Sequence, residues 1–160
     1  FDKISSSIKK FESIGRRFQV LYKKNNIEIV DDYGHHPTEI SVTLETLKDT
    51  RKGKVIAIFE PHRFTRTRDC WNEFLHCFNS ADELYLCPIY PASEKPIHGI
   101  DSVRLVQDIN NLHPNFAHYI DSLEEMDKII KKNPGATIIT MGAGSIGRAV
   151  REWVLDNDAK

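Results

Sequence analysis

Short apolar runs alternate with segments of helical periodicity along this chain of 160 residues. The apolar runs predict strands at residues 17–22, 27–30, 55–59, 83–87, 116–120 and 136–141. Helical patterns lie at residues 37–50, about 71–78, 103–109, 123–131 and 146–155. The run at 55–59 is continuously apolar, which is typical of a strand buried on both faces of a parallel sheet. The alternation predicts an α/β fold, a Rossmann-like and mostly parallel sheet with helices on both faces.

The N-terminal part departs from this rhythm. A polar segment at residues 23–26 separates the first two strands, so we expect a small β-hairpin that adds an antiparallel edge. Residues 1–15 have weak periodicity, and we interpret them as an arm leading from a preceding domain. Residues 16–160 then form one domain. Because the chain begins with Phe1 and not with Met, we expect a fragment of a longer protein.

Composition narrows the possible partners. A formal net charge of −1 gives no general reason to expect nucleic acid or an anionic membrane surface. No apolar run reaches the length that a membrane span requires. The three cysteines form no CxxC pair, which favours free thiols in a reducing cytoplasm.

The segment between the second strand and the first helix carries the densest chemistry. Asp31, Asp32, Tyr33, His35 and His36 follow an apolar run and precede a helical pattern. The carboxyl ends of strands are where open α/β sheets bind ligands. We therefore expect two acids, a phenol and two histidines at the mouth of one strand-to-helix turn.

A second polar loop follows the buried strand at residues 55–59. Arg63 and Arg66 are three residues apart, so they would share one face of a first helical turn and suit a carboxylate or a phosphate. The alternative is a solvated basic turn whose arginines pair with Glu60 and Asp69. Position favours the first interpretation, because this loop and the acid–histidine segment end at the same edge of the sheet, where they would face each other across one crevice.

Three further sequence patterns say less about function than the two loops above. Residues 142–147 match G-x-G-x-x-G, but they lie in the last strand–helix unit, so the glycines are expected to allow backbone approach to a ligand or tight packing of the last helix. We expect no metal site from Asp31, Asp32, His35, His36 and His62, because neighbouring side chains cannot easily converge on one ion. No G-x-x-x-x-G-K-[ST] occurs, so another domain would have to hold the phosphates of ATP.

Several segments together resemble one enzyme family. Residues 31–39, 59–68 and 89–97 are similar to three signatures of the C-terminal domain of the UDP-N-acetylmuramate–L-alanine ligases, a branch of the Mur ligase family. Residues 15–18 and 142–144 also match the family at the corresponding positions. The resemblance covers essentially the whole chain, and its first two signatures are long and specific.

The resemblance implies a role in peptidoglycan biosynthesis in the bacterial cytoplasm. In the family, ATP phosphorylates the carboxylate of UDP-N-acetylmuramate, the amine of L-alanine attacks the acyl phosphate, and phosphate leaves. The N-terminal domain holds the UDP-sugar, and the central domain holds ATP and Mg²⁺. The C-terminal domain closes over both and brings the amino acid, so the domain alone would be inactive.

The resemblance also implies roles for single residues. Arg17 and Asp32 would contact the nucleotide, Asp32 through the ribose. His35 would orient the amine or take its proton, as suits a group that titrates near neutrality. A bulky Tyr33 would limit the side-chain pocket to a methyl group. The residues expected to surround L-alanine are Tyr33, His35, His62, Arg63 and Arg66.

One position departs from the family pattern, and two alternative functions stay open. The family usually has Gln where this chain has Glu60, which adds a negative charge near the arginines unless it faces inward and pairs with Arg68. A related ligase that recycles murein tripeptide shares the Asp–His–His–Pro motif but lacks the string at residues 61–67. A non-catalytic module that binds a small carboxylate or a nucleotide is the alternative from another class.

Overall fold

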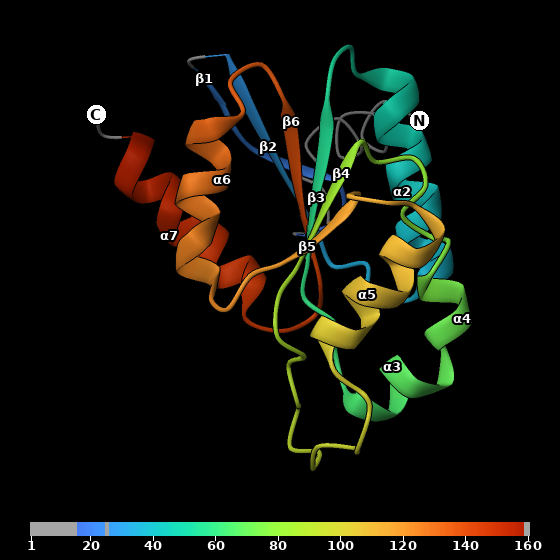
Figure 1. Ribbon diagram of the computed structural model, residues 1–160. Coiled ribbons are helices and arrows are strands. Elements are labelled where there is room, and N and C mark those ends of the chain that lie inside the picture. The colour runs from blue at the N-terminus through green and yellow to red at the C-terminus, as the bar shows by residue number, and fades with distance from the viewer. Residues whose placement is uncertain (1–15, 25, 159–160) are drawn as a thin grey trace, which may run out of the picture.

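Six strands form one sheet in the order β1-β2-β6-β3-β4-β5 (Figure 1). The computed structural model describes residues 16–24 and 26–158, so the expected N-terminal arm at residues 1–15 lies outside the described residues. β1 is antiparallel to β2 and every other neighbouring pair is parallel, which confirms the predicted sheet and its antiparallel edge. The strands are β1 Gln19–Lys24, β2 Ile27–Asp32, β3 Val55–Phe59, β4 Glu83–Leu86, β5 Ala117–Tyr119 and β6 Thr137–Met141.

Helices cover both faces of this sheet, as the alternation predicted (Figure 1). One face carries α2 Pro37–Thr50, α3 Phe64–Asp69, α4 Trp71–Phe74 and α5 Ser102–Leu112; the other carries the 3₁₀ turn η1 Leu123–Glu125, α6 Met126–Lys132 and α7 Ile146–Asp158. Side chains of β3 alternate between the two layers, because successive residues of a strand point to opposite faces. Phe59 packs in the core beneath α2, α4 and α5, whereas Ile58 packs in the core beneath α6 and α7.

The helical pattern around residues 71–78 is not one helix. The chain breaks at Cys70 into α3 and α4 and continues after Phe74 in turns. Phe74 and Phe78 contact Phe59, with ring centroids 5.5 and 5.3 Å apart. The buried residues Thr67, Phe74 and Phe78 are spaced by seven and four, which a continuous helix would also give, so the apolar pattern could not reveal the break.

The carboxyl ends of the central parallel strands meet at one edge of the sheet. β6 lies between β2 and β3, with Asp32 beside Met141 and Met141 beside Phe59. The loop after β6 therefore lies between the loops that follow β2 and β3. The helices after β3 and β6 lie on opposite faces of the sheet. Such a switch point is where open α/β sheets form a ligand crevice.

Candidate active site at the carboxyl edge of the sheet

The two neighbouring acids at the end of β2 do not share a site. The sequence placed Asp31 and Asp32 in the turn, but both belong to the strand and point to opposite faces. Asp31 is fully buried, accepts hydrogen bonds from Arg16 Nε and Thr140 Oγ1, each at 3.3 Å, and forms an ion pair with Arg151 Nη2 at 3.0 Å. Burial raises the pKa of Asp31, although both guanidiniums favour its charged form. Asp31 is thus a structural anchor, and its expected place in the acid–histidine cluster was wrong.

Asp32 holds the backbone on the other side of the strand. It is 4% exposed, and its oxygens accept hydrogen bonds from the N–H groups of Phe18 and Gly34, each at 2.7 Å. A Cβ atom at Gly34 would lie 2.7 Å from Asp32 Oδ1, so this close approach requires glycine. A groove of about 430 Å³ runs beside these contacts. Its lining residues are Arg17, Phe18, Asp32, Thr38, Glu39, Val42 and Thr43.

Tyr33 and His35 lie against each other just beyond the carboxyl end of β2. Their rings meet edge to face, with centroids 5.3 Å apart. His35 Nδ1 lies 3.0 Å from the carbonyl oxygen of Tyr33. A carbonyl oxygen only accepts, so Nδ1 carries the hydrogen in this contact. In the neutral ring, Nε2 is then left with a lone pair that can accept a proton.

His36, the next residue, has a structural role. His36 is the N-cap of α2, and its Nδ1 accepts a hydrogen bond from the N–H of Thr38 at 3.4 Å. Glu39 accepts from the N–H groups of His35 and His36 at 3.1 and 3.2 Å, which completes a capping box. Pro37 is the first residue of the helix, as predicted. His36 therefore starts the helix and does not join His35.

The loops after β3 and β4 bring two more aromatic side chains, His62 and Tyr90, next to His35. His62 stacks on Tyr90, with ring centroids 5.5 Å apart and planes 11° apart, and lies 5.9 Å from the ring of His35. The N–H of Arg63 donates to Tyr90 O and the N–H of Tyr90 donates to Pro61 O, both at 2.8 Å. Burial is the main cause that lowers the pKa of His62, followed by the charge of nearby arginine and histidine. These surroundings favour the neutral form of His62.

The arginines of α3 differ in their surroundings. Arg63 is exposed and has a left-handed backbone with φ of 74°, a strained conformation that is often found at functional sites. Arg66 Nη1 and His62 Nδ1 are buried without a hydrogen-bond partner among the described residues. Arg68, by contrast, pairs with Asp69 at 2.7 Å. The solvated-turn interpretation therefore describes Arg68, whereas Arg66 presents a buried donor that lacks an acceptor.

Glu60 faces inward, but it does not pair with Arg68. It is 4% exposed, and its carboxylate accepts from Ser145 Oγ at 2.5 Å and from the N–H of Ile146 at 3.1 Å. This carboxylate occupies the positive N-terminal end of α7, where a dinucleotide fold would bind its pyrophosphate. A Cβ atom at Gly144 would lie 2.4 Å from Glu60 Oε2. The glycine motif thus permits tight packing, one of the two roles expected of it.

Sequence reasoning assigned no role to two residues that build this crevice. Tyr90 supplies the surface on which His62 stacks. Glu94 accepts from the N–H and the Oγ1 of Thr65 at 2.9 and 2.6 Å and so caps the start of α3. Both lie in the signature segment at residues 89–97, so the resemblance of that segment to the family could have pointed to them. The structure thus brings together Tyr33, His35, His62, Arg63 and Arg66, and places Arg17 and Asp32 in the neighbouring groove.

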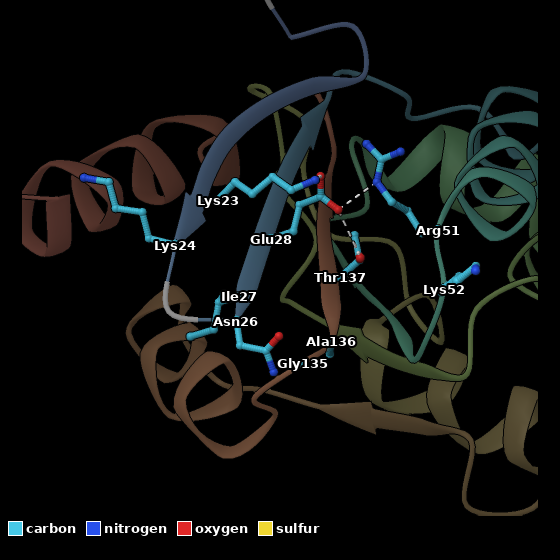
Figure 2. A pocket seen from close by; sticks show the side chains of 10 residues that line it. All are labelled: Lys23, Lys24, Asn26, Ile27, Glu28, Arg51, Lys52, Gly135, Ala136 and Thr137. Carbon is cyan, nitrogen blue, oxygen red and sulfur yellow. Dashed lines mark hydrogen bonds and ion pairs between the residues drawn. The ribbon is translucent and has the colours of Figure 1, made fainter.

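A pocket of about 330 Å³ lies at the opposite edge of the sheet (Figure 2). Its centre is the carboxylate of Glu28, which is 8% exposed. Glu28 accepts from Lys23 Nζ at 3.1 Å, Arg51 Nε at 2.7 Å and Thr137 Oγ1 at 3.3 Å. These groups satisfy one another, so we interpret the pocket as a structural ion-pair network.

Glu28→Gln is expected to remove an acid-sensitive part of the stability. Burial opposes ionisation of Glu28, but hydrogen bonds from Arg51 and Lys23 outweigh it and lower its pKa below the ordinary 4.5. The ionised group therefore stabilises the fold above about pH 4.5, and this contribution is lost as pH falls through the lowered pKa. In urea unfolding, wild type should be more stable than Glu28→Gln at pH 7, with the difference shrinking at pH 3.5. An equal difference at both pH values would contradict the assignment; Glu152→Gln, at an exposed position, is the matched control.

Three further features concern the described ranges, residues 16–24 and 26–158. Within them, no group of three or more histidine, cysteine or acidic side chains could hold a metal ion. No helix there is long and apolar enough to cross a membrane. Cys77 and Cys87 are buried free thiols, and Cys70 is half-buried and free.

The fold defines the class of the protein: a Rossmann-like α/β domain that groups two histidines and two arginines at the carboxyl edge of its sheet. The family described as Mur ligase, glutamate ligase domain, matches residues 16–144. The UDP-N-acetylmuramate–L-alanine ligase of Koribacter versatilis is 41% identical over 149 residues, which cover 92% of this chain and 32% of that protein. The chain belongs to the Mur ligase family, and it spans about a third of the length of the curated relatives it matches.

Solved structures agree with this assignment. The UDP-N-acetylmuramate–alanine ligase of Thermotoga maritima superimposes with a TM-score of 0.74 at 25% identity, over 99% of this chain and 35% of that one. The murein peptide ligase of Psychrobacter arcticus superimposes with a TM-score of 0.69 at 21% identity, over 95% of this chain and 32% of that one. The second likeness shows the fold alone.

Proposed function

We propose that this chain is the C-terminal domain of a bacterial, cytoplasmic, ATP-dependent ligase that joins L-alanine to UDP-N-acetylmuramate. The observation that carries the proposal is a pair of buried nitrogens, Arg66 Nη1 and His62 Nδ1, that have no hydrogen-bond partner among residues 16–24 and 26–158. The His62 ring lies between those of His35 and Tyr90. The relatives at about 41% identity are named as ligases of this specificity. The UDP-sugar, ATP and Mg²⁺ would be held mainly by the N-terminal and central domains that precede this one.

The arginines suit the carboxylate of L-alanine. Arg66 offers a buried donor that no described residue accepts from, and Arg63 lies at the start of the same helix. A carboxylate bound there would satisfy Arg66 with charge-assisted hydrogen bonds, which are about twice as strong as neutral ones. Tyr33 would lie beside the side chain of the amino acid and limit its space to a methyl group.

His35 suits the proton transfer. The amine of L-alanine forms a bond to the carbonyl carbon of the muramoyl phosphate, and the bond from that carbon to the phosphate oxygen breaks, which releases inorganic phosphate. The amine loses one proton in this step. His35 Nε2 can accept it, because Nδ1 is held by the carbonyl oxygen of Tyr33. The surroundings of nearby His62 lower its pKa and so favour its uncharged form.

The groove beside Arg17 and Asp32 suits the nucleotide. Arg17 has an exposed side chain that pairs with Glu39 at 3.6 Å and lies 6.0 Å from the centroid of the Tyr33 ring, and we expect it to turn toward a phosphate when the nucleotide binds. Asp32 already accepts two backbone hydrogen bonds, so a ribose hydroxyl would use its remaining lone pairs. Because these backbone contacts fix the carboxylate, it is preorganised for such a contact.

The test is phosphate release by the full-length protein, in which this chain follows its N-terminal and central domains. The assay contains UDP-N-acetylmuramate, ATP and Mg²⁺, with L-alanine compared against murein tripeptide. Release that depends on L-alanine is the expected result. Release with tripeptide alone would move the protein to the recycling ligases, and release with neither would favour a non-catalytic binding module. The chain by itself is expected to release no phosphate.

A further inference from the structure

Arg16 makes more contacts around the crevice than any role given to it so far explains. Its carbonyl oxygen accepts the N–H of Tyr33 at 2.7 Å, and its guanidinium lies 5.0 Å from the centroid of the Tyr33 ring. Its Nη2 donates to the carbonyl oxygen of Gly142 at 2.5 Å, and its Nε donates to Asp31 Oδ2 at 3.3 Å. One residue thus joins β2, the loop after β6 and the ring that walls the pocket.

The rest of the fold is shaped to keep this guanidinium in place. A Cβ atom at Gly147 would lie 2.3 Å from Arg16 Cζ, so the last glycine of the G-x-G-x-x-G motif leaves the space that the guanidinium fills. Asp31, which anchors it, is fully buried. Arg151 also pairs with Asp31, at 3.0 Å, which leaves Asp31 a cationic partner if Arg16 is removed. These contacts give Arg16 one geometry.

Tyr33 needs such support, because its side chain is not held by burial. The residue is 37% exposed, and its ring contacts His35 edge to face at 5.3 Å. A cation over the face of a tyrosine ring attracts it, and a ring held in one rotamer defines a pocket wall better than a mobile one.

We propose that Arg16 is a positioning residue that holds the Tyr33 ring and thereby sets the selection of L-alanine over larger amino acids. The inference rests on the proposed function. Arg16 acts through Tyr33 and does not touch the amino acid. Gly147 makes the arrangement possible, which gives the third glycine of the motif a purpose unrelated to dinucleotides.

The test is the specificity of the full-length enzyme carrying Arg16→Gln. We expect the ratio of kcat/KM for L-alanine to that for L-serine to fall roughly three- to tenfold, the size of a cation–π contact. The KM values for UDP-N-acetylmuramate and ATP should not change. Arg151→Gln is the matched control, because it removes the other guanidinium from Asp31 without touching Tyr33, and it should leave the ratio unchanged.

Two more variants separate positioning from general damage. Gly147→Ala displaces the guanidinium without removing a charge and should lower the ratio in the same direction. In a Tyr33→Leu background, Arg16→Gln should have no further effect on the ratio, because the ring that it holds is absent. An unchanged ratio in Arg16→Gln, or an equal fall in Arg151→Gln, would overturn the inference.

A spectroscopic measurement tests the role of Arg16 independently of the proposed function. In protein labelled with 3-fluorotyrosine, the Tyr33 signal is assigned by its loss in Tyr33→Phe. It should shift in Arg16→Gln and stay in place in Arg151→Gln, whether or not the enzyme uses L-alanine. Wild type without L-alanine-dependent phosphate release would sink the proposed function, whereas an unmoved Tyr33 signal in Arg16→Gln would sink only the role of Arg16.

Discussion

Replacing Arg66 with alanine in the full-length ligase is expected to raise the KM for L-alanine roughly 10- to 100-fold, the loss of one hydrogen bond to a charged group. Arg66 Nη1 is buried and has no acceptor in the described part of the chain, so we expect the carboxylate of L-alanine to be its partner. Arg63 is exposed, and Arg63→Ala should have the smaller effect of the two. Steady-state kinetics with L-alanine varied at saturating UDP-N-acetylmuramate measures this difference.

Arg68→Ala is the matched control for this prediction. Arg68 lies in the same helix and loses the same charge, but it pairs with Asp69 at the surface at 2.7 Å. Its removal should leave the KM for L-alanine unchanged, because exposed ion pairs contribute little. The KM for UDP-N-acetylmuramate should stay constant in all three variants. Equal effects of Arg66→Ala and Arg68→Ala would show that general electrostatics, and not a bound carboxylate, explains the loss.

Much of this architecture could be predicted from local pattern. Strand β3 was predicted with its observed bounds, because a short, continuously apolar run in an α/β fold is typical of a strand that is buried on both faces. The start of α2 was visible in Pro37, whose fixed φ suits a first turn. The convergence of residues 33–36 and 60–66 followed from topology alone, since parallel strands end at one edge.

The parts that could not be predicted depend on partners far away in the sequence. β2 runs two residues further than its apolar run, because Asp31 pairs with Thr140 in β6 and Asp32 with Met141. That extension turns neighbouring acids to opposite faces. Glu60 finds its partners at Ser145 and Ile146, 85 and 86 residues away. A pattern read along one segment contains no information about such partners.

Gly144→Ala is expected to lower kcat/KM for L-alanine roughly 100-fold, the effect of misplacing a site by about 1 Å. The new Cβ atom would lie 2.4 Å from Glu60 Oε2 and 2.5 Å from Tyr90 Cγ. One of these must move, and either movement reaches the crevice. Tyr90 carries the stacked ring of His62, and Glu60 directly precedes the loop that carries Arg63.

Gly53→Ala separates this effect from a loss of stability. Gly53 has a φ of 104°, and a Cβ atom there would lie 3.4 Å from Gly135 O, at the edge of the sheet opposite the crevice. Alanine at this φ should cost about 1 kcal/mol of unfolding free energy or more through backbone strain. Urea unfolding should therefore show both variants destabilised, while only Gly144→Ala loses activity. If activity followed unfolding free energy in both, the loop after β6 would support the fold and not the geometry of the site.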